Sequence, residues 1–168
     1  MITGVVATLL SFFQGLVNIF FSARYRVEGD SMSPALAHGE SVLVVRTRFR
    51  WNELRRGDVA VFKRPGGGGG AYIKRVVGLP SEDLKLAGGR VYLDGELLVE
   101  DHIQGAVAAE APEDREWFIG PDEYFLLGDN RGDSNDSRAF GLVSVDLIKG
   151  RAWFRCWPPL KWRPIGRQ

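Results

Sequence analysis

Gly29-Asp30-Ser31-Met32-Ser33-Pro34 lies between an apolar N-terminal run and the first β-branched segment of the chain. It places a small hydroxyl residue, Ser31, in a turn bounded by glycine and proline, where little steric cover separates the side chain from a substrate. Ser31 is therefore a candidate nucleophile. The same composition is common in ordinary turns, so the stretches that follow decide between the two interpretations.

Downstream of this turn the chain predicts short β-strands. Ser41–Val45, Asp58–Phe62 and Glu123–Leu127 are β-branched or aromatic runs. Asp94-Gly95 predicts a two-residue hairpin turn between apolar runs. Signals for helices are faint after the N-terminal run. We therefore expect a mainly β fold, a curled or closed antiparallel barrel-like domain that leaves few sheet edges exposed.

Ala71 to Pro80 is a strand-like run that carries a lysine among apolar and aromatic residues. Alternation places Tyr72, Lys74 and Val76 on one face. Burial of Lys74 would lower its pKa and make a neutral amine available as a base, whereas the alternative is a surface lysine with its head in water. The five glycines Gly66–Gly70 predict a mobile loop before this strand.

Ile2 to Phe21 carries no formal charge. At about 1.5 Å per residue a helix of this length spans roughly 30 Å, the thickness of the hydrocarbon core of a bilayer. We therefore predict a transmembrane anchor over residues 1–23 and one folded domain over residues 24–168. A cleavable signal peptide would need a positive start and a small-residue exit. An amphipathic surface helix is the other alternative, but its polar face would hold no Lys or Arg.

The overall charge gives no sign of a highly charged partner. Lys and Arg total 22 against 21 Asp and Glu, so we expect no nucleic acid partner. The single cysteine, Cys156, excludes an internal disulfide.

Gly128–Arg138 alternates acidic, amide and basic residues, which indicates either a solvated loop or a buried hydrogen-bonded network. Asp129, Asp133 and Asp136 resemble an oxygen-rich calcium loop. The glutamate expected at the twelfth position is missing, however, and two arginines lie among the candidate ligands. We therefore expect neither a metal nor another cofactor.

Four stretches, taken together and in order, resemble the sequence boxes of type I signal peptidases. They are Gly29–Leu36, Arg56–Val59, Tyr72–Pro80 and Gly128–Arg138. The resemblance implies a membrane-anchored serine endopeptidase that removes signal peptides from exported preproteins through a Ser-Lys dyad. By matching position it implies Ser31 as the nucleophile and Lys74 as the general base.

The resemblance also implies residues that support the dyad. Ser134 would hydrogen-bond Lys74 and orient its amine. Asp136 and Arg138 would form a supporting ion pair, and the supporting charged residues as a set are Asp129, Arg131, Asp136 and Arg138. Gly29 stands where some members carry a Ser or Thr that helps to form the oxyanion hole, so the hole here would rest on backbone donors, chiefly the Ser31 amide.

Substrate and location follow from the same resemblance. The substrates would be preproteins with A-x-A-type signal peptides, whose small residues enter shallow apolar pockets. The residues implied to line these pockets are Val27, Met32, Leu36, Tyr72 and Ile73. The catalytic domain of this single-pass protein would lie on the extracytoplasmic face of the plasma (inner) membrane. Arg24 and Arg26 argue the opposite way, because the positive-inside bias would leave the domain in the cytoplasm.

Arg151–Pro164 interleaves aromatic and basic residues, which is typical of a membrane-interface surface. A strand with core tryptophans is the alternative. The interface interpretation makes membrane lipid a partner and explains the basic residues beside the anchor, because all of these cations would meet lipid headgroups. They are Arg24, Arg26, Arg155, Lys161 and Arg163.

Two other functions stay open from the residues alone. A self-cleaving repressor-type protease shares the Ser-Lys dyad, but it would need a DNA-binding segment in place of the apolar N-terminal run. A membrane-tethered β-domain could bind extended peptides without cleaving them. Loss of turnover on Ser31→Ala separates this binding module from either protease.

Overall fold

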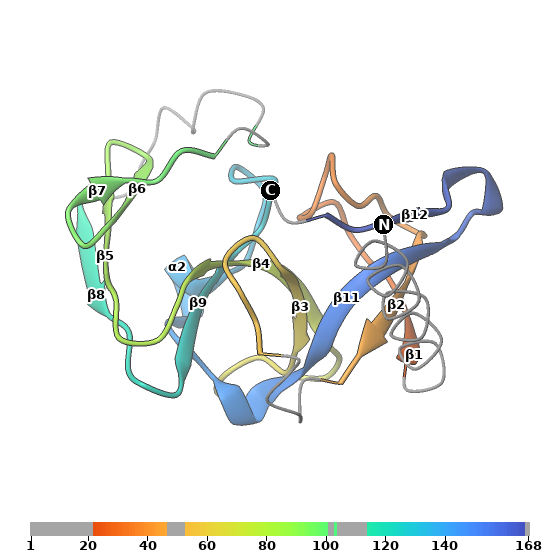
Figure 1. Cartoon of the computed structure of the whole chain (residues 1–168), viewed down its shortest axis with the longest axis horizontal. Coiled ribbons are helices and arrows are strands. Elements are labelled where there is room, and N and C mark those ends of the chain that lie inside the picture. The colour runs from red at the N-terminus through yellow and green to blue at the C-terminus, as the bar shows by residue number, and fades with distance from the viewer. Residues whose placement is uncertain (1–21, 47–52, 101–102, 104–113, 167–168) are drawn as a thin grey trace, which may run out of the picture.

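The computed structural model describes residues 22–46, 53–100, 103 and 114–166, which form two antiparallel sheets (Figure 1). The larger sheet has the strand order β1-β2-β11-β3-β4-β9-β10, with β12 paired to β11, and the smaller sheet has the order β7-β6-β5-β8. The strands of the larger sheet are β1 (Ser22–Arg26), β2 (Ser41–Val45), β3 (Val59–Phe62), β4 (Tyr72–Gly78), β9 (Glu123–Leu127), β10 (Val143–Ser144), β11 (Ile148–Trp157) and β12 (Arg163–Pro164). Those of the smaller sheet are β5 (Asp83–Ala87), β6 (Arg90–Leu93), β7 (Glu96–Leu97) and β8 (Arg115–Phe118).

The predicted strands are confirmed because each coincides with a run that buries apolar side chains. β2 and β9 have the predicted bounds, and β3 starts one residue later than expected, at Val59. Asp94 and Gly95 both have positive φ angles, 49° and 84°, and form the predicted turn between β6 and β7. The helical elements of the described residues are short: α2 (Ser137–Phe140), η2 (Val145–Leu147) and η3 (Pro159–Lys161).

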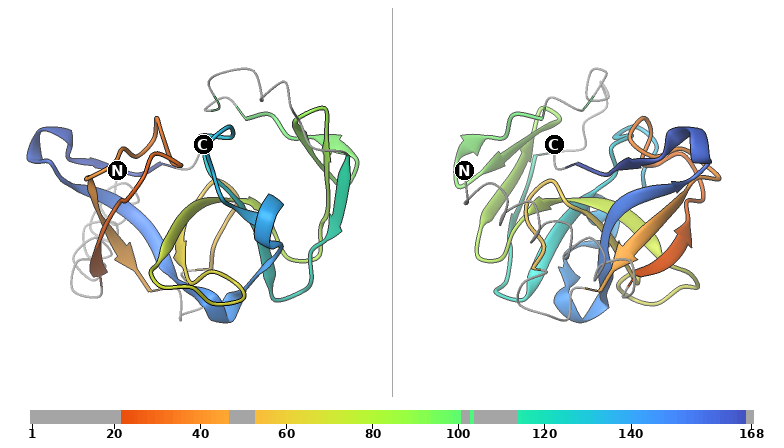
Figure 2. Two further views of the ribbon diagram at one scale, coloured as in Figure 1. Left: turned by 180° about the vertical axis from the view of Figure 1, so that it is seen from behind. Right: turned by 45° about the vertical axis from the view of Figure 1, so that its right-hand side comes forward.

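The larger sheet is strongly curled, as predicted, but its described strands do not close into a barrel. β1 and β10 lie at the two ends of the strand order, and no hydrogen-bonded pairing joins them within the described residues. Figure 2 shows the smaller sheet set to one side of the curl. Within the described residues, β1 has one edge without a strand partner, and the turn that carries Ser31 follows this strand.

Three apolar clusters fill the structure. One lies beneath the Ser31 turn and includes Met32, Leu36 and Val42. A second packs around Phe62 in the curl of the larger sheet. The third joins the two sheets through residues such as Phe125. The chain therefore has enough buried apolar surface to hold the turn and the strands in fixed relation.

The predicted anchor falls almost wholly outside the described residues. No helix among the described residues is long and apolar enough to cross a membrane. Ser22 and Ala23, which the prediction included in the anchor, are instead the first residues of β1 and pair with β2. The anchor over the preceding residues stays a prediction.

The C-terminal stretch forms the long strand β11, which pairs with both β2 and β3 and so ties the sheet together. Its tryptophans are not core residues: Trp153 is half-buried and Trp157 is exposed.

Candidate active site

Ser31 lies in the turn that connects β1 to β2. Ser33 N donates to Asp30 O at 2.9 Å within this turn. Leu36 N then donates to Met32 O at 2.8 Å, so the next residues form a helical turn whose apolar side chains enter the core. The hydroxyl of Ser31 is consequently presented at the edge of a well-fixed segment.

The backbone before the nucleophile candidate requires glycine. Gly29 has a φ of +77°, a conformation that side chains rarely adopt. Its N–H donates to Nδ1 of His38 at 3.0 Å. The histidine, which lies outside the four sequence boxes, therefore closes the same turn, a role that the sequence analysis did not find.

Lys74 reaches Ser31 from the middle of β4. Its side chain is only 3% exposed, and β4 pairs with β3 so that Lys74 lies opposite Ala60. Lys74 Nζ donates to Ser31 Oγ at 2.5 Å across a sequence separation of 43 residues. The predicted burial of this lysine is confirmed, and the fold brings the two dyad candidates into direct contact.

Burial lowers the pKa of Lys74 from its ordinary value of 10.5. The carboxylates of Asp136, Asp129 and Asp133 act in the opposite direction, whereas Arg138 adds to the lowering. Because desolvation is the largest effect, a larger fraction of Lys74 is neutral at a given pH than for a lysine in water. The neutral amine is the form that can accept a proton from a hydroxyl.

We expect activity to rise with pH as a single group loses its proton, with a midpoint below 10.5. Asp133→Asn removes an exposed carboxylate that raises the pKa of Lys74, so the rising limb should move to lower pH. The measurement is kcat/KM against pH for both proteins. A midpoint that stays fixed, or moves to higher pH, contradicts this assignment of the titrating group.

The loop after β9 packs directly against the Ser31 turn. Asn130 N donates to Ser31 O at 3.1 Å, and Asn130 Nδ2 donates to Asp30 O at 3.3 Å. A Cβ on Gly128 would lie 2.5 Å from Ser31 O and 2.2 Å from Ser134 Oγ. Only glycine permits this approach, so the first residue of the predicted polar box sets the distance between loop and turn.

Asp136 and Arg138 form the predicted ion pair. Arg138 Nε donates to Asp136 Oδ1 at 2.8 Å, and its Nη2 donates to Oδ2 at 2.9 Å. Asp136 is fully buried, caps the N-terminus of α2 and accepts a hydrogen bond from Gly128 N at 3.1 Å. The pair therefore fixes both ends of the loop that touches the Ser31 turn.

Asp129 and Arg131 pair with partners that the sequence analysis missed. Asp129 accepts two hydrogen bonds from Arg75, at 2.8 and 2.6 Å, and both side chains are buried. Arg75 also donates to Gly57 O at 2.8 Å, and Gly57, in the Arg56–Val59 box before β3, has a φ of 83° that favours glycine. Arg131 pairs with Glu100 and donates to a backbone carbonyl of its own loop. The contacts of Arg75 with Asp129 and with Gly57, and of Arg131 with Glu100, join segments that are remote in sequence, so no local pattern predicts them.

Ser134 lies beside the dyad but does not make the predicted hydrogen bond to Lys74. Its Oγ is buried and has no hydrogen-bond partner in the part of the chain that the structure describes. The hydroxyl instead lies against Gly128, close to the Ser31 carbonyl. The role of Ser134 in orienting the lysine stays a prediction.

A cleft of about 920 Å³ opens beside Ser31 and Lys74. Val27, Tyr72 and Ile73 line it as predicted. Met32 and Leu36 do not line it, because both are fully buried in the apolar cluster beneath its floor. Helical spacing after Ser31 turns these two side chains inward, so they support the floor of the cleft and do not form its surface.

A buried ion pair ties the Ser31 turn to the C-terminal strand. Arg155 Nη1 donates to Glu40 Oε1 at 3.0 Å, and Arg155 also donates to Ala35 O. Lys161 Nζ donates to the same carboxylate at 3.1 Å, and Glu40 Oε2 accepts from Ala37 N at 3.1 Å. The prediction that Arg155 meets lipid headgroups is wrong, since its guanidinium is buried in this contact.

Among the described residues, no group of His, Cys, Asp or Glu side chains is arranged to hold a metal ion. The carboxylates of the polar loop are instead engaged with arginines, as the pairs at Asp129 and Asp136 show.

The family model described as "Signal peptidase, peptidase S26" matches residues 1–157. The chain belongs to this signal peptidase family. It is 36% identical over 154 residues to "Signal peptidase I" of Leptolyngbya laminosa, covering 86% of this chain and 72% of that protein. It is 32% identical over 158 residues to "Signal peptidase IB" of Staphylococcus aureus strain COL, covering 85% and 82%.

A crystal structure of a signal peptidase I from Enterococcus faecalis V583 resembles the fold, with a TM-score of 0.50 and 28% identity. The likeness covers 59% of this chain and 96% of that one. Together with the family, it identifies this signal peptidase as a serine endopeptidase that cleaves signal peptides. A repressor-type protease and a non-cleaving peptide-binding module are not favoured.

Proposed function

We propose that this signal peptidase cleaves through Ser31 as nucleophile and Lys74 as general base. The observation that supports the proposal best is the 2.5 Å contact between Lys74 Nζ and Ser31 Oγ, made by an amine whose pKa is lowered by burial. Neutral Lys74 takes the Ser31 proton while Oγ attacks the scissile carbonyl carbon. The Ser31 amide is the proposed donor to the oxyanion.

Lys74 then acts a second time in the proposed cycle. Its ammonium gives the proton to the leaving amine, so that the mature protein departs and the signal peptide stays on Ser31 as an ester. The amine, neutral again, takes a proton from a water molecule that attacks the ester carbonyl. It returns this proton to Ser31 Oγ as the ester C–O bond breaks, and the signal peptide leaves with a new carboxyl group. Ser134, whose hydroxyl lies against Gly128 close to the Ser31 carbonyl, is proposed to orient this amine.

We further propose that the substrates carry small residues at the first and third positions before the cut. Val27, Tyr72 and Ile73 line the same cleft as Ser31, in which the peptide would lie extended. Bulky side chains would meet the β-branched walls near the nucleophile, whereas alanine would fit. This is the A-x-A preference of secretory signals.

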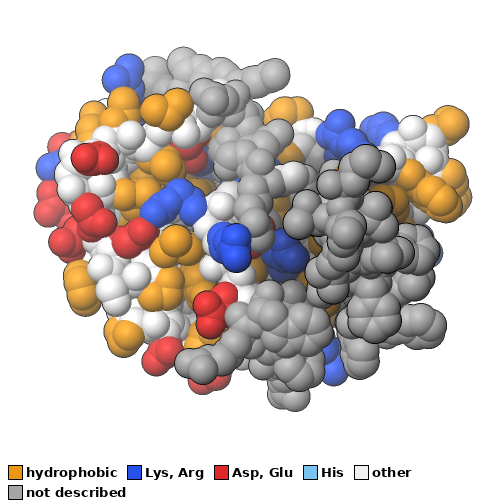
Figure 3. Space-filling view, in the orientation of Figure 1, with side chains coloured by type: hydrophobic (Ala, Val, Ile, Leu, Met, Phe, Trp, Pro, Cys, Tyr) orange, Lys and Arg blue, Asp and Glu red, His pale blue; other side chains and the backbone are white. Residues whose placement is uncertain are grey.

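The proposed location is the extracytoplasmic face of the plasma (inner) membrane, with a single-pass anchor over residues 1–21 and the catalytic domain from Ser22, the first residue of β1, onward. The loop between β11 and β12 supports the proposed contact with lipid, because its residues Leu160 and Trp162 are 100% and 61% exposed. Figure 3 shows hydrophobic side chains at its tip. Exposed indole rings of this kind favour the membrane interface.

The test is cleavage of a preprotein by the full chain in detergent. We expect wild type to cut after A-x-A and Ser31→Ala to leave the same preprotein intact while it stays folded. Replacing the alanine at the first or third position of the substrate by leucine should also prevent cutting. Cleavage by Ser31→Ala would overturn the nucleophile, and cleavage of both leucine substrates would overturn the proposed specificity.

A further inference from the structure

The walls of the cleft carry charge of opposite sign at their two ends. The carboxylates of Glu28, Asp30 and Asp133 line the cleft near Ser31, and the amines of Lys63 and Lys149 line it elsewhere. None of these five forms an ion pair within the described residues. Their charges are therefore available to a peptide in the cleft.

The acidic end is fixed beside the nucleophile. Glu28 and Asp30 lie within three residues of Ser31 in the same turn. Asp133 precedes Ser134, whose hydroxyl lies against the glycine that approaches Ser31 O. All three carboxylates are exposed.

The basic end, formed by Lys63 and Lys149, lies at the far end of β3. Lys63 follows the last residue of that strand, Phe62, which pairs with both Tyr72 and Ile148. Lys149 is therefore beside the same strand end. Its Nζ lies 5.8 Å from the centre of the Tyr25 ring, and Tyr25 also lines the cleft.

The distance between the two ends can be counted along β4. Tyr72 precedes Lys74 by two residues, and Lys63 lies one step beyond the pair that Phe62 makes with Tyr72. At about 3.3 Å per residue, three steps place the basic end roughly 10 Å from the dyad along the strand. Ile73 and Tyr72, the proposed apolar pocket residues, lie between the dyad and the basic end.

Near the basic end, part of the cleft is lined by glycines, which have no side chains. Gly68, Gly69 and Gly70 line the cleft there, and a Cβ on any of them would meet nothing within 4 Å. Arg26 also lines the cleft, but its guanidinium lies near Gly39. A substrate side chain that extends past the pockets therefore has room to reach the two lysines.

We propose that Lys63 and Lys149 form a subsite for an acidic side chain of the substrate, at the fourth to sixth position before the cut. This inference rests on the proposed function, because the pocket residues define which end of the cleft faces the signal peptide. The subsite selects among signal peptides by charge and, together with the carboxylates near Ser31, favours one direction of the peptide in the cleft. Since the lysines are accessible to solvent, each ion pair between a substrate carboxylate and one of the lysines should change kcat/KM by no more than about fivefold. Added salt should reduce this effect.

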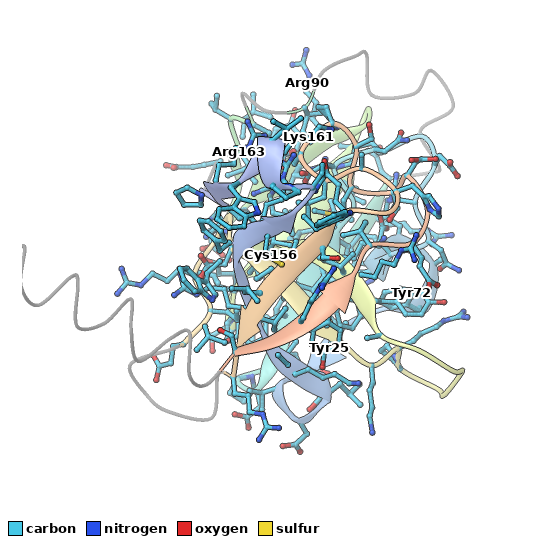
Figure 4. The ribbon with its side chains drawn as sticks, turned by 90° about the vertical axis from the view of Figure 1, so that its right-hand side faces the viewer. Tyr25, Tyr72, Arg90, Cys156, Lys161 and Arg163 are labelled. Carbon is cyan, nitrogen blue, oxygen red and sulfur yellow. The ribbon has the colours of Figure 1, made fainter. Side chains whose placement is uncertain are left out.

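The test compares synthetic A-x-A peptides that carry Asp, Asn or Lys at the fourth, fifth or sixth position before the cut. For wild type we expect at least one position where kcat/KM falls in the order Asp, Asn, Lys, with the difference lost at 0.5 M NaCl. Lys63→Glu combined with Lys149→Glu should reverse the order. Arg90→Glu is a matched control, because this exposed residue lies on the smaller sheet and Figure 4 shows it at the opposite end of the molecule from Tyr25.

The outcomes separate the subsite from the function on which it rests. Cleavage of all the peptides at equal rates, or an order that the double variant leaves unchanged, overturns the subsite and leaves the protease assignment standing. Failure of wild type to cut any A-x-A peptide overturns the proposed specificity and the subsite with it.

Discussion

Lys74→Met is expected to abolish signal-peptide cleavage and to leave the protein folded. Methionine has nearly the length of the lysine stem, so the site in β4 stays filled, and the substitution removes an amine that is costly to bury. Without that amine no base lies within hydrogen-bond distance of Ser31 Oγ in the described residues. Loss of a general base that also activates the nucleophile should lower kcat by at least about 10³-fold.

The measurement is single-turnover cleavage of a preprotein in detergent, with urea unfolding of each variant in parallel. Ser31→Ala and the double variant should lose as much activity as Lys74→Met alone, because the two side chains act as one unit. Lys85→Met is the matched control: it removes an exposed lysine whose partner, Glu116, lies on the smaller sheet. Lys74→Met activity above a tenth of wild type would show that another group serves as the base.

Much of the fold is predictable because its strands are encoded by local patterns. β2 is a continuous β-branched run, and Asp94-Gly95 has the residues that a tight hairpin turn requires. Closure of the sheet was the part that could not be predicted. It depends on which strands meet at the ends of the strand order, and β1 and β10 stay at opposite ends in the described residues.

The dyad was predictable only through the family resemblance. Ser31 and Lys74 are 43 residues apart, and neither has a local pattern that points to the other. Residue spacing could not show two features that the structure shows. The pairing of β3 with β4 orients Lys74, and contacts from the loop after β9 hold the Ser31 turn. Met32 shows the converse error, since the family resemblance implied that it lines a pocket although its side chain enters the core.

The ion pairs around the site were the least predictable feature. Glu40 and Arg155 are separated by 115 residues, and Arg155 was expected to meet lipid because its neighbours are aromatic and basic. Charge patterning along a strand does not show which face is covered. The covering segment here is the Ser31 turn itself, which becomes clear only when β11 is placed beside β2.

Asp129→Asn should lower the free energy of unfolding by about 3–5 kcal/mol, the cost typical of breaking a buried ion pair from one side. Arg75 would keep its hydrogen bond to Gly57 O but lose its countercharge while buried. Urea unfolding of the full chain measures the change. Glu116→Gln, which breaks the exposed pair with Lys85, is the control and should leave the free energy of unfolding nearly unchanged.

The pair at Asp129 should also show how stability and catalysis are separated at this site. Arg75→Met combined with Asp129→Leu removes both charges, so it should recover much of the stability that Asp129→Asn loses. Activity should not recover to the same extent, because Asp129 belongs to the loop that packs against the Ser31 turn, and its replacement removes the contact that fixes this loop to β4. If the double variant were as unstable as the single one, packing around Arg75 would be the dominant contribution and the buried charge a minor one.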